Sequence, residues 1–457
     1  MLRSPWERVA ALAVLAGAVW LPFAGRTLSP DEGGLLIVGG QWSPGVSVYG
    51  DYFVDRPPLL VALFSLVDGL GGSAWALRLL GVLAVVATVL LAGATGRAAG
   101  GSPTLAAATA AVFVATPLFG ATVVNAEVLG LPFVLGGVAA ALMAGRAERW
   151  LRWALLAGAL GACAVLVKQS ILDVFVFAAV LLVLRRRWGA LGGVALGGVV
   201  AVAVAVALAT TRGTSPADLW QAVVVFRSQA AEVIAESATG TTASRFLAML
   251  TALLVSIAPA LALALAIRAR RSPLLWPTLA VLAWELTVVF GGGSYWLHYL
   301  LGLVPGLVLL AAAAPGHDRF VRGAYLFCAT STVIALVHVL VNPIDRPEEP
   351  AIAWLDEHTA DGDTAVVAFG AANILRETGL PSPYPDLWSL PVRVHDPDLA
   401  SFASLLASPE RPTWVVVVGA SLQTWGVDGT SADEVLAEHY SPAVATGRWT
   451  IYRSDAG

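Results

Sequence analysis

The sequence predicts a polytopic α-helical membrane protein with a small water-soluble α/β domain at its C-terminus. Of its 457 residues, 58% are hydrophobic, and the mean hydropathy is +0.77. Many apolar runs approach the roughly 20 residues that a helix needs to cross a hydrocarbon core of about 30 Å. Because backbone polar groups must be satisfied inside lipid, only helices and closed barrels span membranes. The long unbroken runs exclude the barrel.

Charge divides the chain into two parts. Residues 1–341 carry 21 basic and 14 acidic side chains, whereas residues 342–457 carry 6 basic and 17 acidic ones. An acidic, water-soluble segment therefore follows a mildly basic membrane domain. We predict a transmembrane domain over 1–341 and an extracytoplasmic α/β domain over 342–457. A nucleic-acid partner is disfavoured, because such partners require a concentrated basic face.

Eleven apolar segments are predicted to span the membrane. They cover residues 9–25, 75–96, 103–120, 127–145, 152–168, 170–184, 189–209, 245–267, 274–291, 298–314 and 323–341. With a cytoplasmic N-terminus, every arginine cluster falls on a cytoplasmic turn, as the positive-inside bias requires. The clusters are Arg97, then Arg146, Arg149 and Arg152, then Arg185, Arg186 and Arg187, then Arg268, Arg270 and Arg271, and finally Arg319 and Arg322.

This topology puts loops 26–74 and 210–244 and the C-terminal domain outside the plasma (inner) membrane. The use of arginine in place of lysine, with abundant alanine, glycine and valine, is typical of a high-GC bacterial genome.

Within loop 26–74, the semi-apolar stretch Pro57–Leu70 predicts a surface-lying helix or a half-buried entry to the second span.

The C-terminal domain is predicted to alternate helices and strands. Helices are expected at Ala351–His358 and, after a Ser431 cap, at Ala432–His439. Strands are expected at Ala365–Phe369 and at the β-branched run Trp414–Val418. The stretch Pro381–Pro397, rich in proline and aromatic residues, is expected to be a loop. Its exposed segment around Asp386-Leu387-Trp388 is a candidate contact for an acceptor or a cell-envelope partner.

Carboxylates at the outer membrane surface are the first candidates for chemistry. They are Asp31, Glu32, Asp51, Asp55 and Glu127. Asp31 and Glu32 follow Pro30 directly after the first span, which fixes their position. Any one of these acids is equally consistent with a solvated loop residue, and Glu127 also suits a helix N-terminus.

Charged residues inside or beside the spans form a second group. Lys168 is the only lysine of the chain and ends an apolar run at the outer face, against the positive-inside trend. Alternatively, the Lys168 side chain only extends its ammonium group to the outer lipid head groups and has no functional role. Asp173 and Glu285 lie inside spans near the outer end and are expected to pair with Lys168 or with outer-loop arginines, in a structural or a substrate-binding role.

His298 starts a span in the segment Gly291–Tyr299, whose aromatic residues suit the membrane interface. Together with Arg56, Lys168 and Arg245, His298 could surround an anion at the outer surface, opposite Asp31 and Asp55. A hard divalent cation could be held between Asp55 and Glu127, because such ions prefer carboxylate oxygens.

Taken in chain order, these segments resemble the GT-C superfamily of membrane glycosyltransferases. The similarity is greatest to the bacterial branch related to protein O-mannosyltransferases and the lipid A aminoarabinose transferase. It covers roughly residues 5–345. The matching pieces are Asp31-Glu32, the stretch 52–59 (YFVDRPPL), the stretch 126–132 (AEVLGLP), Lys168, and His298-Tyr299 with Pro305.

The resemblance implies a GT-C-like fold and roles for the acids. Asp31, with Glu32 beside it, would be the catalytic base. Asp55 and Glu127 would help to hold a divalent metal (Mg²⁺ or Mn²⁺) or the donor head group. Many relatives have Glu-Lys where this chain has Asp55-Arg56, and Asp where it has Glu127, which leaves metal dependence open.

The resemblance also implies a donor, a sugar on a polyprenyl phosphate, which reacts at the outer membrane face. Arg56 and Lys168 match the basic residues that contact the donor phosphate, and His298 and Tyr299 are further candidates. The expected activity is inverting transfer of a hexosyl or pentosyl group to a hydroxyl of a lipid, glycan or protein acceptor. Direct displacement needs a base at the acceptor hydroxyl and positive charge at the leaving phosphate.

Two other functions fit the composition. A transporter or flippase of a lipid-linked sugar would place its charges near the bilayer midplane and often shows repeated halves, neither of which the sequence displays. A non-catalytic scaffold of the cell envelope is the other alternative.

Overall fold

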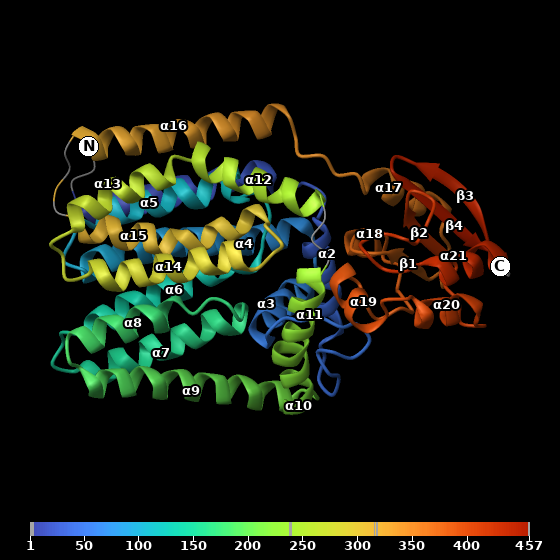
Figure 1. The fold of residues 1–457 in the computed structure, drawn as a ribbon, viewed down its shortest axis with the longest axis horizontal. Coiled ribbons are helices and arrows are strands. Elements are labelled where there is room, and N and C mark those ends of the chain that lie inside the picture. The colour runs from blue at the N-terminus through green and yellow to red at the C-terminus, as the bar shows by residue number, and fades with distance from the viewer. Residues whose placement is uncertain (1–3, 237–239, 315, 317–318, 456–457) are drawn as a thin grey trace.

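The computed structural model describes residues 4–236, 240–314, 316 and 319–455. One end of the molecule is a bundle of helices that run side by side, and the other end is a small sheet with flanking helices (Figure 1). The helices of the bundle are α1 (Pro5–Trp20), α4 (Ala74–Ala98), α5 (Pro103–Ala115), α6 (Ala126–Ala144), α7 (Trp150–Val167), α8 (Asp173–Leu184), α9 (Trp188–Thr211), α12 (Gly240–Val255), α13 (Ala258–Ala269), α14 (Leu275–Gly291), α15 (Leu303–Ala313) and α16 (Arg319–Val341). The predicted fold class is confirmed.

All eleven predicted spans coincide with helices of this bundle. Among the described residues, six helices are long and apolar enough to cross a membrane, while α5, α8, α13, α14 and α15 are shorter. The predicted span 245–267 is broken, because α12 ends at Val255 and α13 begins at Ala258, with Ile257 in a left-handed conformation (φ 61°) between them. The number of membrane crossings stays a prediction.

Local sequence explains where several helices begin. A serine or asparagine occupies the N-cap and accepts a hydrogen bond from the backbone N–H three residues later, which satisfies one of the free donors of the first turn. These caps are Ser4 for α1, Ser29 for α2, Ser73 for α4, Ser102 for α5 and Asn125 for α6. The last of these caps fixes the position of Glu127 in the first turn of α6.

The segment 26–74, predicted as an outer loop, folds largely into two helices. The expected helix over Pro57–Leu70 is confirmed as α3 (Pro58–Gly69), but the sequence gives little sign of α2 (Pro30–Gln41), whose glycines weaken helix propensity. The same glycines allow close packing. A side chain at Gly39 would collide with the backbone of α3, against which α2 lies.

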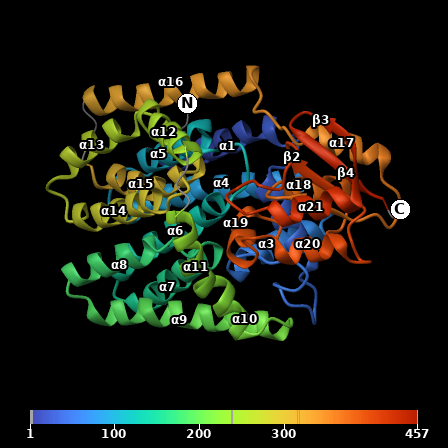
Figure 2. The same ribbon diagram turned by 45° about the vertical axis from the view of Figure 1, so that its right-hand side comes forward.

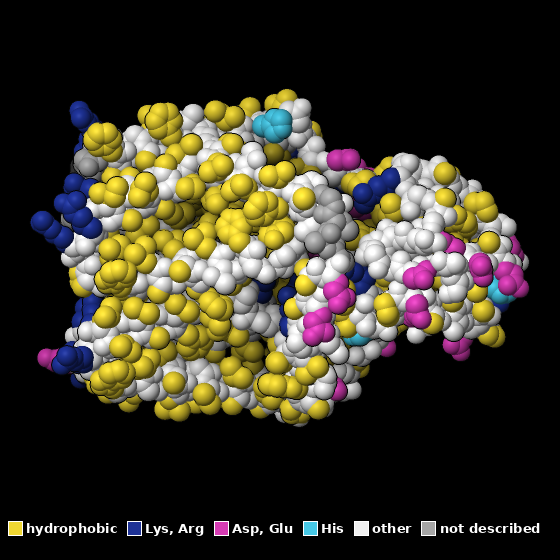
Figure 3. Space-filling model, in the orientation of Figure 1, with side chains coloured by type: hydrophobic (Ala, Val, Ile, Leu, Met, Phe, Trp, Pro, Cys, Tyr) yellow, Lys and Arg dark blue, Asp and Glu magenta, His cyan; other side chains and the backbone are white. Residues whose placement is uncertain are grey.

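Charge is unevenly distributed along the molecule. Basic side chains gather at the end of the bundle remote from the sheet, where the turns α4–α5, α6–α7, α8–α9, α13–α14 and α15–α16 lie (Figure 3). Acidic side chains gather around α11 and the sheet, and a broad band of hydrophobic side chains covers the bundle between the two ends (Figure 3). The bundle thus presents an apolar belt of the kind that lipid requires.

Three short elements cross the end of the bundle that faces the sheet. They are α10 (Pro216–Trp220), the π-helical turn η3 (Gln221–Val225) and α11 (Phe226–Glu236). α11 runs roughly perpendicular to the bundle helices and lies between them and α19 (Figures 1 and 2). Residues of the predicted outer loop 210–244 therefore cover the bundle end.

The C-terminal part contains a four-stranded sheet in the order β1-β2-β4-β3. The strands are β1 (Ala365–Ala368), β2 (Trp414–Val418), β3 (Tyr440–Thr446) and β4 (Trp449–Ser454). β1 and β2 are parallel, with Ala365 opposite Trp414, and the other pairs are antiparallel. The helices around the sheet are α17 (Glu349–His358), α18 (Ala372–Thr378), α19 (Ser389–His395), α20 (Ala400–Ala407) and α21 (Thr430–His439).

The predictions for this part were accurate where apolar patterns were strong. Both expected strands and both expected helices are present. However, Ser431 lies inside α21, whose N-cap is Gly429 without a side-chain hydrogen bond, so the Ser431 cap was wrong. The stretch Pro381–Pro397 is not all loop, because it contains α19. Asp386 and Leu387 are buried and Trp388 is half-buried, so this segment is not exposed.

Candidate functional site

Glu32 holds the start of α2 in place. It is fully buried, and its carboxylate faces the buried guanidinium of Arg78 in two hydrogen bonds, from Nε to Oε1 (2.8 Å) and from Nη2 to Oε2 (2.6 Å). Oε1 also accepts from the backbone N–H of Val124 (2.7 Å), and Oε2 accepts from that of Ser29 (2.9 Å). Four N–H donors therefore occupy the two Glu32 oxygens. Through these hydrogen bonds, Glu32 joins α2 to α4 and to the turn before α6.

Asp31 differs from Glu32 in its exposure and in its partners. Its side chain is exposed, and no ion pair to it is present among the described residues. Oδ1 accepts a hydrogen bond of 3.0 Å from the indole Nε1 of Trp388, at the start of α19. Its second oxygen is thus available to a substrate hydroxyl.

Close packing brings Trp388 to this position. A side chain at Gly34 would collide with the Trp388 ring, and one at Gly33 would collide with the backbone of Asn373 in α18. The Asn373 amide donates to the carbonyl of Leu28 (3.0 Å), immediately before α2. The C-terminal part therefore docks directly on the helix that carries Asp31.

Asp55 lies between two arginines. Its Oδ1 is 2.6 Å from Nη1 of Arg56, and its Oδ2 is 2.6 Å from Nη1 of Arg227 in α11. Burial alone would raise the pKa of the Asp55 carboxyl, but the two guanidinium groups outweigh it and hold this pKa below its usual range. Gln169 donates to the Asp55 carbonyl (2.8 Å), which fixes the loop beside the α7–α8 turn.

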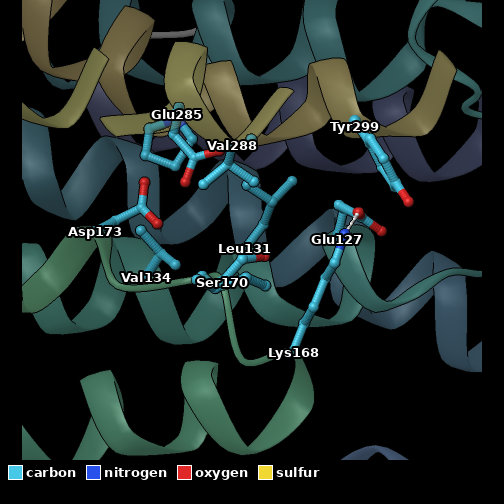
Figure 4. A pocket seen from close by; sticks show the side chains of 12 residues that line it. Glu127, Leu131, Val134, Lys168, Ser170, Asp173, Glu285, Val288 and Tyr299 are labelled. Atoms are coloured by element: carbon cyan, nitrogen blue, oxygen red, sulfur yellow. Dashed lines mark hydrogen bonds and ion pairs between the residues drawn. The ribbon is translucent and has the colours of Figure 1, made fainter. Parts of the chain in front are cut away.

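Glu127 and Lys168 form an ion pair between the N-terminal end of α6 and the C-terminal end of α7 (Figure 4). The second Glu127 oxygen, Oε2, is 3.8 Å from Nε2 of His298 in η4 (Leu297–Gly302). The ammonium of Lys168 lies 4.0 Å from the centre of the Tyr299 ring, within cation–π distance. Burial alone would lower the pKa of Lys168, but Glu127 and Tyr299 raise it above its usual value.

Arg56 joins these groups into one electrostatic cluster. Burial alone would lower the pKa of its guanidinium, but Asp55, Asp31, Tyr299 and Glu127 all favour the charged form and raise the pKa. About a third of the Arg56 side chain is exposed (31%), and only Nη1 contacts Asp55. Because a guanidinium carries five N–H donors, Arg56 can bind an anion without releasing Asp55.

The structure thus brings together most of the residues predicted from sequence: Asp31, Asp55, Arg56, Glu127, Lys168, His298 and Tyr299. Arg245 stacks on Trp296 at 4.7 Å, and its place around an anion stays a prediction. The predicted pairing of Asp173 and Glu285 with a cation is wrong. Asp173 and Glu285 face each other across a small cavity, and neither forms an ion pair with a cation among the described residues (Figure 4).

Three residues of the site escaped the sequence analysis or were placed elsewhere. Arg78 could have been noticed, because it is a lone arginine in the first turns of an apolar span, away from the clusters at the other end. Arg227 carries no local signal. Trp388 was noticed only as an exposed aromatic residue, and its contact with Asp31 spans 357 positions of the chain.

The carboxylates of this arrangement do not fit a divalent metal. Asp55 uses both oxygens on arginines, and Glu127 faces Lys168 and His298. A cation bound between Asp55 and Glu127 would have to displace these positive groups. Among the described residues, there is no group of three or more His, Cys, Asp or Glu side chains that could hold a metal.

An apolar groove opens beside the cluster. It has a volume of about 570 Å³ and lies between α12, α16 and the turns before α6 and α15. Leu297, next to His298, and Leu118, near Gly120, belong to its wall. Gly120 packs directly on His298, since an added Cβ would lie 3.0 Å from the His298 backbone. The wall of the groove therefore includes the residue that precedes His298 in the chain.

Comparison with known families and structures agrees with this architecture. Residues 55–209 match the family model described as dolichyl-phosphate-mannose-protein mannosyltransferase. No curated protein matches the sequence.

Three solved structures share the fold. A crystal structure of ArnT from Cupriavidus metallidurans bound to undecaprenyl phosphate is similar over 97% of both chains, with a TM-score of 0.66 and 16% sequence identity. The apo oligosaccharyltransferase of Archaeoglobus fulgidus is similar over 98% of this chain and 74% of its own, with a TM-score of 0.58 and 13% identity. The mycobacterial arabinofuranosyltransferase AftD is similar over 99% of this chain and 42% of its own, with a TM-score of 0.50 and 15% identity. This chain therefore shares the fold of these three structures, which is the fold that the resemblance to the GT-C superfamily implies.

Proposed function

We propose that this protein is an inverting glycosyltransferase that moves a sugar from a polyprenyl-phosphate donor to an acceptor hydroxyl at the outer membrane face. One observation carries the proposal. An exposed carboxylate without an ion pair, Asp31, lies in the same electrostatic cluster as Arg56 and Lys168. A base beside a group of cations is the arrangement that direct displacement of a phosphate requires.

Asp31 acts as the base in this mechanism. The acceptor hydroxyl gives its proton to the free Asp31 oxygen while its own oxygen bonds to the anomeric carbon. The bond from that carbon to the phosphate oxygen breaks, its electron pair stays on the phosphate, and polyprenyl phosphate leaves. Because attack and departure occur on opposite faces of the carbon, the product has the inverted anomeric configuration.

Glu32 has a positioning role in this proposal, in contrast to the catalytic role expected from its place beside Asp31. Its carboxylate is buried against Arg78 and accepts four hydrogen bonds. Loss of Glu32 would release the N-terminus of α2 and thereby Asp31.

The leaving phosphate is stabilised by positive groups that already face the cluster. Arg56 and Arg227 keep 31% and 43% of their side chains exposed, so both guanidinium groups can turn N–H donors toward an anion. Lys168 supplies a fixed charge, and His298 and Tyr299 close the site on the side of η4.

The donor's prenyl chain fits the apolar groove between α12 and α16. The groove reaches Leu297, next to His298, so a chain lying in it would deliver its phosphate to the cluster. The bound lipids of two similar structures support this donor class. ArnT is bound to undecaprenyl phosphate, and an archaeal oligosaccharyltransferase is in complex with a dolichol-phosphate.

The topology follows from the charge distribution. The arginine-rich turns lie at the end of the bundle remote from the sheet (Figure 3), which corresponds to the cytoplasmic side under the positive-inside bias. The cluster and the domain over 342–457 then lie outside the plasma membrane of a bacterium. Residues 1–341 form the catalytic domain, and the domain over 342–457 lies against the site through the contact of Trp388 with Asp31.

The test is sugar transfer by wild-type and Asp31→Asn protein. Membranes that contain either protein are supplied with radiolabelled polyprenyl-phosphate sugars, and the labelled products are identified with their anomeric configuration. We expect label to move only with the wild type, and with inversion. If Asp31→Asn transfers sugar at the wild-type rate, or the product retains the donor configuration, the proposal is wrong. If Asp31→Asn loses lipid translocation as well as transfer, the transporter alternative gains support.

A further inference from the structure

Two carboxyl groups face each other inside the bundle, behind the proposed phosphate site. Asp173 begins α8 and is 1% exposed, and Glu285 lies in α14 and is 4% exposed. They come from neighbouring helices and are close enough to interact directly (Figure 4). Both line a cavity of about 20 Å³ that extends from Glu127, Lys168 and Tyr299 toward the bundle interior.

The Asp173 carboxyl group faces the Glu285 carboxyl and has no N–H donor among the described residues. Both of its oxygens are buried, and neither accepts a hydrogen bond from a described residue. A buried polar group in that condition is costly, and it is aimed into the cavity (Figure 4). A proton shared with Glu285, or a water molecule, can therefore satisfy these oxygens.

Among the described residues, the surroundings of the pair contain one cation, Lys168, which is already engaged. The titratable groups that face the pair are Glu127 from α6, Lys168 from the α7–α8 turn and Tyr299 from η4. Lys168 is paired with Glu127 at the outer end of the cavity (Figure 4). Three carboxyl groups therefore share one ammonium, which leaves an excess of negative charge in the helical bundle if all are ionised.

The site has a defined shape. An added Cβ at Gly302 would collide with Glu285 Oε2, so the Glu285 carboxyl occupies space that exists only because residue 302 is glycine. On the opposite side, the indole of Trp284 donates to the carbonyl of Ser170 (3.0 Å), which holds the turn before Asp173 against α14. Both carboxyl groups are thus fixed by their neighbours.

Two ionised carboxylates in contact within a low-dielectric interior repel strongly, and such pairs bind a proton between them. The cavity volume of about 20 Å³ is sufficient for one water molecule. We propose that Asp173 and Glu285 form an intramembrane proton-binding site in which the pair shares one proton across this cavity.

The bound proton has a consequence for the neighbouring site, and this step rests on the function proposed above. With the proton in place, the pair carries one negative charge instead of two, so more of the Lys168 charge is available to the leaving phosphate. A phosphate at Lys168 in turn disfavours ionisation of the pair. By linkage, the proton on the pair must strengthen the binding of phosphate, and phosphate must strengthen the binding of the proton.

Infrared spectroscopy of the purified protein in lipid nanodiscs tests the proton site without requiring transfer activity. We expect the C=O band of a protonated carboxylic acid in the wild type at neutral pH. Asp173→Asn and Glu285→Gln should each remove it, and Glu434→Gln, at an exposed position of α21, should not. Gly302→Ala, which displaces the Glu285 carboxyl, should shift or weaken the band.

Three outcomes would overturn the proposal. One is the absence of this band from the wild type at neutral pH. Another is a band that survives both carboxyl variants. The third is its disappearance on addition of Na⁺ or K⁺ at constant pH, which would make the cavity a metal-cation site instead.

The coupling is tested by adding undecaprenyl phosphate. We expect the pH at which the band disappears to rise in the wild type and in Asp31→Asn, which retains the phosphate-binding groups. If the band behaves as expected but does not respond to the lipid, the coupling to phosphate is wrong and the proton site stands. If no donor supports transfer, the band in the wild type and the carboxyl variants still decides whether the proton site exists.

Discussion

Trp388 and Asp31 are joined by a hydrogen bond of 3.0 Å between the indole Nε1 and the carboxylate Oδ1. The bond connects the C-terminal part of the protein to the proposed catalytic base on α2. It leaves the other carboxylate oxygen available to the acceptor. The C-terminal part therefore contributes to the orientation of the proposed base.

Replacement of Trp388 by phenylalanine should lower the transfer rate while leaving donor binding intact. Phenylalanine keeps an aromatic ring at this position but cannot donate to Asp31. A hydrogen bond to a charged group contributes about 1.5–3 kcal/mol, which corresponds to a decrease in kcat of roughly 12- to 150-fold. The measurement is kcat and KM for the donor, with Trp425→Phe, an exposed tryptophan of the same domain, as the matched control. A rise in KM at unchanged kcat would contradict the positioning role.

Glu32→Gln should destabilise the whole bundle, because it leaves the buried Arg78 guanidinium without its counter-charge. Removing one partner of a buried ion pair costs about 3–5 kcal/mol. Replacing both partners by apolar residues, as in Glu32→Leu with Arg78→Met, should recover much of that loss, since no buried charge then remains. Thermal unfolding in detergent micelles measures both effects, and Glu434→Gln is the exposed control. A double variant less stable than Glu32→Gln would show that the pair itself is not the cause.

The membrane bundle was predictable because hydrophobic runs and arginine-rich turns are local signals. All eleven predicted segments are helical, and only α12 and α13 depart from the pattern, at the left-handed Ile257. Short helices such as α2 were not predictable, since their stability comes from close packing at glycines and not from propensity. Strands β3 and β4 are half-exposed and polar, so their sequences carry a weak pattern.

The site was partly predictable for the same reason. Asp31, Arg56 and Lys168 stand out because charge is rare in this chain and their positions fall at the ends of spans. Their neighbours do not stand out. Which cation pairs with which acid depends on contacts such as Arg227 with Asp55, which are separated by 172 positions. No local pattern encodes such a pair.

The ion pair of Arg227 with Asp55 predicts a specific dependence of stability on pH. The pKa of Asp55 is lowered in the folded protein. Its pairing therefore stabilises the fold above the unfolded pKa of about 3.9, and this contribution is lost as the pH falls through the lower folded pKa. In Arg227→Ala the pKa of Asp55 should be lowered less. Because Arg227 is 43% exposed, we expect a loss of about 1 kcal/mol at neutral pH that shrinks on acidification.

Thermal unfolding between neutral and acidic pH measures this difference, with Arg227→Lys as the charge-retaining control. Arg227→Lys should follow the wild type more closely than Arg227→Ala at neutral pH. A stability difference between wild type and Arg227→Ala that grows as the pH falls would have the wrong sign and would exclude this explanation.

Removal of divalent metal should leave sugar transfer unchanged. Both oxygens of Asp55 contact arginines, and Glu127 faces Lys168 and His298, so the positions at which a metal was expected are already neutralised by the protein's own cations. Because Arg56, Arg227 and Lys168 can stabilise the leaving phosphate directly, no further positive charge is needed there.

The measurement is the initial transfer rate after treatment with EDTA, followed by readdition of Mg²⁺ or Mn²⁺. Lys168→Met provides the comparison, since it removes a protein cation and should slow transfer with or without metal. A rate that collapses with EDTA and returns with Mn²⁺ would show that Asp55 or Glu127 exchanges its cationic partner for a metal when the donor binds.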